Sequence, residues 1–288
     1  MRVHIAHPDD IPGWLQLAAE VEPLFGPMAH DPVFYRALRK NIERSTAFCV
    51  REGDGPPGSP LMGGLLFSPH PPHYVIGWLA VAERWRGHGV GHRLIDHALD
   101  LVQIPADIAV TTFAEGIQGG ETARRLYHRI GLRPAESGPT NPAGIPTQVY
   151  RCNLSRTPTV RAVMQHEDRY LLVQHDNHLP ETIGKWGLPG GRVDPTDTDR
   201  ESALRRELRE EFQVEVEVIG FLHTYIYRER LHHIFHVRPV SMDLVFDPNE
   251  ILGHTWLTYE EIEAWETAGK LHTGFEYPAI TASRKTLP

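Results

Sequence analysis

The sequence predicts an α/β protein made of two tandem domains. Its 288 residues suit two domains better than one, and 41% of them are hydrophobic, enough for two cores. Short β-rich runs alternate with amphipathic helices in both halves of the chain. The polar, proline-containing stretch 155–158 is the expected linker between a first domain, 1–154, and a second domain, 159–288.

The composition narrows the class of function. A formal net charge of −8 argues against a general binder of nucleic acid or of anionic membranes. Cys49 and Cys152 are the only cysteines, which excludes a disulfide scaffold and a multi-cysteine zinc module. The longest apolar run, 74–82, is too short to span a bilayer, and no apolar signal-peptide core follows the first residues. We therefore expect a soluble cytoplasmic protein.

The first half alternates between the two kinds of element. Asp31, followed by Pro32, is a typical helix start, and glycine- and proline-rich stretches separate the β-rich runs. The predicted strands are 3–6, 47–50, 61–67, 74–81, 108–112, 132–135 and 148–154. The predicted helices are 9–21, 31–42, 89–102 and 122–130.

The same alternation restarts after the linker. The predicted strands are 160–165, 170–174, 214–228, 234–240 and 256–257. A glycine- and proline-rich loop spans 184–191, and the predicted helices are 199–212 and 259–265. Histidines 232, 233 and 236 fall on a β-rich run, which predicts a half-exposed strand in preference to a zinc site.

A glycine-rich segment links the strand 74–81 to the helix that follows it. Glycines let a phosphate approach the backbone, and the first amides of a helix lack partners within the helix. A tight strand-to-helix turn explains the glycines alone equally well, so the wider pattern has to decide. The segment reads Arg86-Gly87-His88-Gly89-Val90-Gly91.

Arg86, Gly89 and Gly91 match the pattern Arg or Gln, two residues, Gly, one residue, Gly or Ala. Together with the segment 123–132, which contains Tyr127, they make the first half resemble GNAT-family N-acetyltransferases. The resemblance implies a mixed twisted sheet with flanking helices, acetyl-coenzyme A as cosubstrate and an amine acceptor. The sequence departs from the family's pattern at two positions: the family often has proline where Glu83 stands, and asparagine where Gly120 stands.

The resemblance also assigns roles. Backbone amides of residues 87–91 would hold the pyrophosphate of the coenzyme, and the strand end 79–81 would pair with its pantetheine arm. Tyr127 would be the catalytic acid that protonates the departing thiolate. The implied coenzyme-binding residues are Leu79, Val81, Arg86, Gly87, His88, Gly89, Val90 and Gly91.

Three glutamates share one face of the predicted helix 199–212. Glu207, Glu210 and Glu211 are spaced i, i+3 and i+4, and hard divalent cations favour such oxygen clusters. A charged surface helix, with Arg206 and Glu210 paired at i, i+4, is the simpler explanation of the glutamates taken alone.

The flanks of these glutamates resemble the Nudix box: Gly, five residues, Glu, seven residues, Arg-Glu-apolar-any-Glu-Glu-any-Gly-apolar. The match requires one extra residue between Gly191 and Arg206. Thr198 stands where the first Glu is expected, and Gln213 replaces the final Gly. Asp194, Asp197 and Asp199 surround the gap. A side chain at position 213 would strain the chain if a left-handed conformation is needed there.

Nudix membership implies an α/β/α sandwich that hydrolyses a nucleoside-diphosphate-linked compound with Mg²⁺ or Mn²⁺. Glu207, Glu210, Glu211 and the Gly190 carbonyl would hold the metal. Arg206 would orient one of the glutamates and completes the implied catalytic set.

Two functional hypotheses follow. The first is a bifunctional enzyme, an N-acetyltransferase fused to a metal-dependent pyrophosphohydrolase, whose partners are small molecules and neither nucleic acid nor membrane. The alternative is that only one half is active and the other is a ligand-binding or regulatory module. The substitutions at Thr198 and Gln213 favour a silent hydrolase, and those at Glu83 and Gly120 favour a silent transferase.

Overall fold

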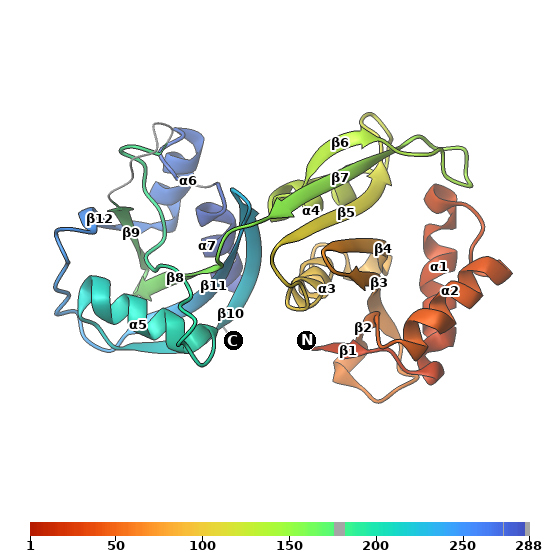
Figure 1. Cartoon of the computed structure of the whole chain (residues 1–288), viewed down its shortest axis with the longest axis horizontal. Helices are drawn as coiled ribbons and strands as arrows, with labels where there is room; N and C mark the ends of the chain where they lie inside the picture. Colours follow the sequence, from red (N-terminus) through yellow and green to blue (C-terminus); the bar gives the residue numbers. More distant parts are fainter. Residues whose placement is uncertain (176–181, 273, 286–288) are drawn as a thin grey trace. The chain divides into compact units, whose positions relative to one another are not determined.

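The computed structural model describes residues 1–175, 182–272 and 274–285 (Figure 1). It divides into two compact units, Met1–Ser155 and Arg156–Pro288. In the part of the chain that is described, each unit is built on its own mixed sheet, with seven strands in the first and five in the second. The predicted α/β class is therefore confirmed. None of the described helices is long and apolar enough to cross a bilayer.

The first unit is a mixed sheet with the strand order β1-β2-β3-β4-β5-β7-β6. Neighbouring strands are antiparallel except β4 and β5, which are parallel. The strands are β1 (Val3–Ile5), β2 (Ala47–Arg51), β3 (Leu61–His70), β4 (His73–Val81), β5 (Ala106–Phe113), β6 (Arg133–Ser137) and β7 (Thr147–Leu154). The helices are α1 (Ile11–Phe25), α2 (Pro32–Glu43), α3 (Val90–Leu99) and α4 (Glu121–Ile130).

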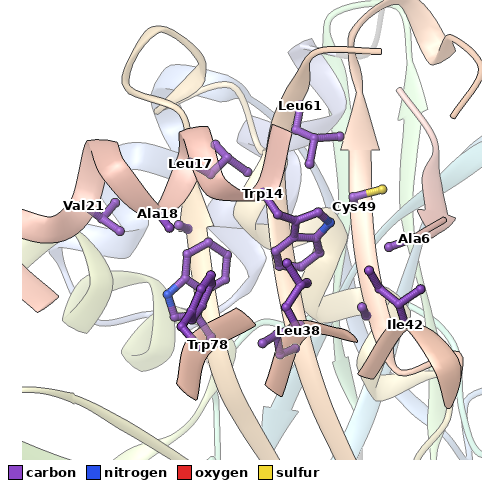
Figure 2. Packing of buried hydrophobic residues seen from close by; sticks show 14 of the residues in the cluster. Ala6, Trp14, Leu17, Ala18, Val21, Leu38, Ile42, Cys49, Leu61 and Trp78 are labelled. Atoms are coloured by element: carbon purple, nitrogen blue, oxygen red, sulfur yellow. The ribbon is translucent and has the colours of Figure 1, made fainter. Parts of the chain in front are cut away.

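Packing of α1 and α2 against the sheet forms one core of this unit (Figure 2). α2 begins as predicted, because the Asp31 carboxylate accepts a hydrogen bond from the Val33 amide at 2.8 Å and Pro32 occupies the first turn. Trp14 of α1 is fully buried, with its ring centroid 5.4 Å from that of Trp78. A Cβ on Gly64 would lie 2.7 Å from the Trp14 ring, so only glycine lets the helix lie this close to β3.

The parallel pair β4 and β5 separates halfway along. Their pairing covers only 73–76 with 107–110. Gly77 is the extra residue of a bulge against β3, because Ile76 pairs with Phe67 and Trp78 pairs with Leu66. Beyond the bulge β4 pairs with β3 alone within the described strands, while β5 continues along β7. The end of β4 therefore presents an open edge on its β5 side.

The second unit has the strand order β10-β11-β8-β9-β12, with β8 and β11 parallel and the other neighbours antiparallel. The strands are β8 (Thr159–His166), β9 (Arg169–His175), β10 (Val216–Tyr227), β11 (Arg230–Pro239) and β12 (Ile251–Thr258). The helices are α5 (Arg200–Phe212), α6 (Tyr259–Thr267) and α7 (Glu276–Lys285).

Each face of this sheet has its own core. Leu204, Leu208 and Phe212 of α5 pack with Val160 and its neighbours at alternate positions of β8. Ile262 of α6 and Ile280 of α7 pack with the opposite face, which includes Val163, Leu172 and Ile234. The sheet lies between helices, which is the sandwich arrangement that the resemblance implied.

The histidines of β11 correct one prediction. His232, His233 and His236 are 7%, 1% and 1% exposed, so the strand is buried on both faces and not half-exposed. Their ring nitrogens lie at hydrogen-bonding distance from the hydroxyls of Thr159 (2.8 Å) and Thr224 (2.9 Å) and from Gln165 Oε1 (2.9 Å) respectively. The alternation of the sequence could not show that helices cover both sides of this strand.

Candidate functional site

The glycine-rich loop of the first unit is open. Gly87 and Gly89 have φ of 79° and 83°, and a Cβ on either glycine would meet nothing within 4 Å. Gly89 caps α3, and the first hydrogen bond of the helix runs from the Arg93 amide to the Gly89 carbonyl at 3.0 Å. Residues 89–91 therefore lie ahead of this first bond, in the turn where backbone amides of a helix are suited to bind an anion.

The other predicted coenzyme residues surround this loop. Arg86 donates through Nε to the Val81 carbonyl at 3.2 Å, and His88 Nδ1 lies 3.0 Å from the Arg86 carbonyl. Leu79 and Val81 are half-buried on the open end of β4, whereas Val90 is buried in the core. The structure thus brings the loop and the open strand edge together at one end of the sheet.

Gly91 brings α4 close to the loop. A Cβ at position 91 would lie 3.1 Å from Leu126, the residue before Tyr127. Tyr127 is 4% exposed, and burial raises the pKa of its phenol, which therefore stays protonated at neutral pH. His70 and His73 pair at the other end of β4.

In the second unit, the three glutamates of α5 have different environments. The Glu211 side chain is buried, accepts a hydrogen bond from the Gly190 amide at 2.9 Å and lies 3.3 Å from His175 Nε2. Burial acts to raise the pKa of Glu211, but the hydrogen bond from His175 and the charge of Arg161 outweigh it and hold that pKa below its usual value. Glu207 is mostly buried, and a Cβ on Gly191 would overlap its carboxylate.

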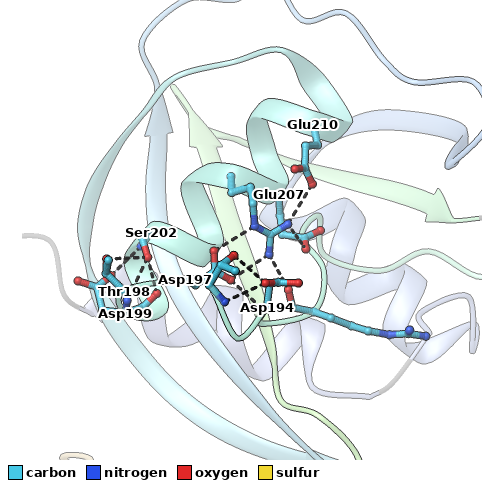
Figure 3. A network of polar contacts seen from close by, with 10 residues as sticks. Asp194, Asp197, Thr198, Asp199, Ser202, Glu207 and Glu210 are labelled. Carbon is cyan, nitrogen blue, oxygen red and sulfur yellow. Dashed lines mark hydrogen bonds and ion pairs between the residues drawn. The ribbon is translucent and has the colours of Figure 1, made fainter.

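Arg206 links two of these glutamates, Glu207 and Glu210, which are labelled in Figure 3. Its Nη1 donates to Glu207 at 2.8 Å and to Glu210 at 3.0 Å, the second being the i, i+4 pair that the sequence suggested. The Glu210 side chain is 58% exposed. The structure therefore gathers Glu207, Glu211 and Gly190, and connects Glu210 to them only through Arg206.

Asp197 occupies the gap in the motif. Its carboxylate accepts two hydrogen bonds from Arg206, at 3.0 Å from Nε and 3.0 Å from Nη2, and its side chain is 5% exposed. These hydrogen bonds hold the pKa of Asp197 below its usual value and raise that of Arg206. Thr198 instead points to the Ser202 hydroxyl at 3.2 Å, and Asp199 caps α5 through the Ser202 amide.

Gln213 ends α5 in the left-handed conformation. Its φ and ψ are 50° and 35°, and its amide donates to the Arg209 carbonyl at 3.0 Å. This position therefore requires the backbone geometry that favours glycine, as the motif suggested.

The donor atoms fit a hard divalent cation. Carboxylates and a backbone carbonyl are the oxygen ligands that Mg²⁺ and Mn²⁺ take. Burial, together with the charges of Glu211 and Glu210, raises the pKa of Glu207 despite the hydrogen bond from Arg206. Across the described ranges, no three His, Cys, Asp or Glu side chains are arranged to hold a metal together. Glu210 is turned to Arg206, and the guanidinium of Arg161 donates to the Gly190 carbonyl.

A cavity of about 540 Å³ opens beside these glutamates. Sequence reasoning missed most of its lining, including Arg161 and His175 from two strands. The sequence did offer a reason to single out Arg161, because it is the one charged residue in the apolar run 159–164. Charged and polar lining residues are Arg156, Arg161, His175, Arg192, Glu207, Glu211, Arg228, Arg230, His232, Asn249, Glu250, His272 and Glu276.

Family models match the two units separately. The model of the acetyltransferase (GNAT) family matches residues 13–132, and that of the NUDIX domain matches residues 155–275. No curated protein sequence matches the chain.

Solved structures of both families are similar to parts of the chain. A GNAT-family acetyltransferase from Bacillus cereus is 13% identical, covering 54% of this chain and 98% of that one, with a TM-score of 0.40. A NUDIX hydrolase from Nitrosomonas europaea is 23% identical, covering 45% and 89%, with a TM-score of 0.37. The E. coli ORF135 protein is 24% identical, covering 44% and 87%, with a TM-score of 0.36. From the two family matches and their order, the chain joins a GNAT acetyltransferase-family domain to a C-terminal NUDIX domain.

Proposed function

We propose that the protein is bifunctional. Its first domain transfers an acetyl group from acetyl-coenzyme A to an amine, and its second hydrolyses a nucleoside-diphosphate-linked compound with Mg²⁺ or Mn²⁺. In this proposal residues 155–158 link a domain of residues 1–154 to one of residues 159–288. The observation that carries it is that each domain has groups suited to a phosphorylated ligand: open left-handed glycines before α3, and, beside a cavity, carboxylates that can hold a divalent cation.

The transferase proposal uses the loop and the open strand edge together. Amides of residues 87–91 bind the pyrophosphate of the coenzyme, and the unpaired side of β4 at Leu79 and Val81 hydrogen-bonds the amides of the pantetheine arm. The amine nitrogen attacks the thioester carbonyl, the carbon–sulfur bond breaks, and the protonated Tyr127 gives its proton to the thiolate. The tyrosine recovers a proton as the amine loses one.

The hydrolase proposal uses the α5 glutamates. Glu207, Glu210, Glu211 and the Gly190 carbonyl would hold the metal, which when bound polarises the phosphate oxygens and lowers the pKa of a water. Arg206, held by Asp197, positions Glu207. The oxygen of one water bonds to one phosphorus, the bridging P–O bond breaks, and the protons of the water pass to the products and the solvent.

One observation favours a second candidate, in which the NUDIX domain binds a phosphorylated ligand without hydrolysing it. The Arg161 guanidinium is bonded to the Gly190 carbonyl, an expected metal ligand. In this candidate Arg161 supplies the positive charge that a metal supplies in an active site.

Two assays test the proposal. Isothermal titration with acetyl-coenzyme A should show binding that Gly89→Glu abolishes and Gly144→Glu does not. Both glycines have a positive φ and open space around them, so the two substitutions impose the same backbone strain. The transferase proposal fails if the two variants bind alike.

For the hydrolase, the full chain is incubated with Mg²⁺ and nucleoside triphosphates, dinucleotides or nucleotide sugars. Turnover that requires Mg²⁺ and is lost in Glu211→Gln supports hydrolysis. Binding of these compounds without metal, and without turnover at any Mg²⁺ concentration, supports the second candidate.

A further inference from the structure

Arginines from separate segments meet on the cavity of the second unit. Arg156 precedes β8, Arg192 follows the glycine loop, and Arg230 begins β11. The backbone brings them together: the Arg156 amide donates to the Glu229 carbonyl at 3.2 Å, and Thr159 pairs with both Arg192 and His232. The start of β8 thus places three cations at one end of the cavity.

Arg230 has a buried side-chain nitrogen that no described group neutralises. Its Nε is buried and has no hydrogen-bond partner within residues 1–175, 182–272 and 274–285. Burial, together with the positive charges of Arg156, Arg192 and Arg161, lowers the pKa of Arg230 to about 10. Burying a cation without a partner beside other cations costs free energy, which a bound anion would recover.

The net charge of the residues around the cavity indicates how much negative charge a bound ligand can carry. Five arginines and four glutamates line it among the described residues. A divalent cation would add two positive charges, and a pyrophosphate esterified at both ends carries two negative ones. A positive charge remains, which a further anionic group of the substrate can neutralise.

We propose that Arg230, with Arg156 and Arg192, forms an anion subsite for a phosphate group beyond the phosphate bond that is cleaved. The substrate of the second domain then carries a free terminal phosphate, as a nucleoside triphosphate does, and not a neutral sugar. Guanidinium groups suit this role because they bind phosphate oxygens in pairs. The subsite deepens the proposed hydrolase function and rests on it for the identity of the substrate.

The subsite is tested first without metal or catalysis. Inorganic tripolyphosphate is titrated calorimetrically into the full chain in EDTA, in a Gly89→Glu background that removes the anion site of the first unit. Arg230→Gln should weaken binding about tenfold, the effect of losing one charge-assisted hydrogen bond. Arg238→Gln, an exposed position on the same strand outside the cavity, should change it less than about twofold.

Equal binding by Arg230→Gln and Arg238→Gln overturns the subsite, as does a parent protein that does not bind tripolyphosphate. If Arg230→Gln does not fold, the exposed Arg156→Gln replaces it, with weaker binding still expected.

Kinetics then separate the subsite from the hydrolase proposal. With Mg²⁺, Arg230→Gln should lower kcat/KM for a nucleoside triphosphate about tenfold and leave that for a nucleotide sugar within about twofold. Glu211→Gln should lower kcat/KM for both substrates. Equal losses on the two substrates in Arg230→Gln contradict the proposed selectivity. If the parent turns over neither substrate, hydrolysis is rejected and the tripolyphosphate titration alone decides the subsite.

Discussion

Asp197 and Arg206 form a two-point ion pair that holds α5 of the second domain to the loop before it. The two hydrogen bonds are each 3.0 Å long, and Arg206 reaches from this pair to Glu207 and Glu210. The motif expects a glutamate one residue later, at Thr198. Asp197, one position earlier, is the carboxylate of this loop that meets Arg206.

Asp197→Asn should weaken the metal site. The amide cannot accept two charge-assisted hydrogen bonds, so Arg206 loses its fixed position and Glu207 is no longer oriented. We expect Mn²⁺ affinity to fall about tenfold, measured by paramagnetic titration of the full chain. Thr198→Ala is the matched control, because Thr198 is exposed and its hydroxyl points to that of Ser202 and not to Arg206. Equal losses of Mn²⁺ affinity in the two variants would show that Asp197 does not support the metal site through Arg206.

Gln213→Gly should stabilise the second domain. A non-glycine residue in the left-handed region costs about 1 kcal/mol, part of which is offset by the greater freedom of glycine in the unfolded chain. We expect a gain of roughly 0.5 kcal/mol in the free energy of unfolding, measured with urea. Gln213→Ala keeps the strain and should bring no gain, so a similar gain from alanine would reject strain as the cause.

Tyr127→Phe should slow acetyl transfer without weakening coenzyme binding. Removing a general acid costs about a hundredfold in kcat, whereas the buried ring still packs in α4. Release of the coenzyme thiol is followed with a panel of primary amines, and the dissociation constant of acetyl-coenzyme A is measured by titration. Tyr150→Phe, whose ring centroid lies 6.3 Å away, is the control and should retain activity. An unchanged kcat in Tyr127→Phe would remove the tyrosine from the mechanism.

Buried histidines should make the second domain sensitive to acid. Burial, with a contribution from the charge of Arg200, lowers the pKa of His233 to about 3, whereas in the unfolded chain it is about 6.5. The stability it contributes is complete above pH 6.5 and is lost as the pH falls toward 3, at about 1.4 kcal/mol per pH unit. His233→Gln should remove one proton from the uptake on unfolding, measured as a shallower slope of the unfolding free energy between pH 6 and about 4.5. A slope equal to that of the parent would contradict the buried neutral state.

The sequence predicted those features of the fold that depend on residues close together in the chain. The cap at Asp31, the glycine loop before α3 and the spacing of Glu207 and Glu211 depend on neighbours in the sequence, and the structure has the corresponding elements. α5 begins at Arg200 with Asp199 as its cap, within one residue of the prediction. By contrast, α3 ends at Leu99 and not at 102, because helix ends depend on the turn that follows.

The start of β11 could not be predicted for a specific reason. Arg228 and Glu229 form the two-residue turn between Tyr227 and Arg230, and both have positive φ without being glycine or asparagine. The sequence therefore lacked the usual signal for the hairpin, and Arg230 and Leu231 were not predicted to belong to the strand that carries the histidines. Arg230 was missed with it.

Contacts between distant segments were beyond sequence reasoning. His175 meets Glu211, and Arg161 meets the Gly190 carbonyl, only because strands β8 and β9 pass beside α5 and the glycine loop. The arginine end of the cavity likewise depends on the parallel pairing of β8 with β11. No periodicity or motif encodes these contacts.

A crystal of the full chain soaked with Mn²⁺ and acetyl-coenzyme A gives the most direct test of phosphate recognition in both domains. We predict the coenzyme pyrophosphate on the amides of residues 87–91, and an anomalous manganese peak bounded by Glu207, Glu211 and the Gly190 carbonyl. A coenzyme bound elsewhere, or manganese absent from the α5 carboxylates at millimolar concentration, would contradict the account.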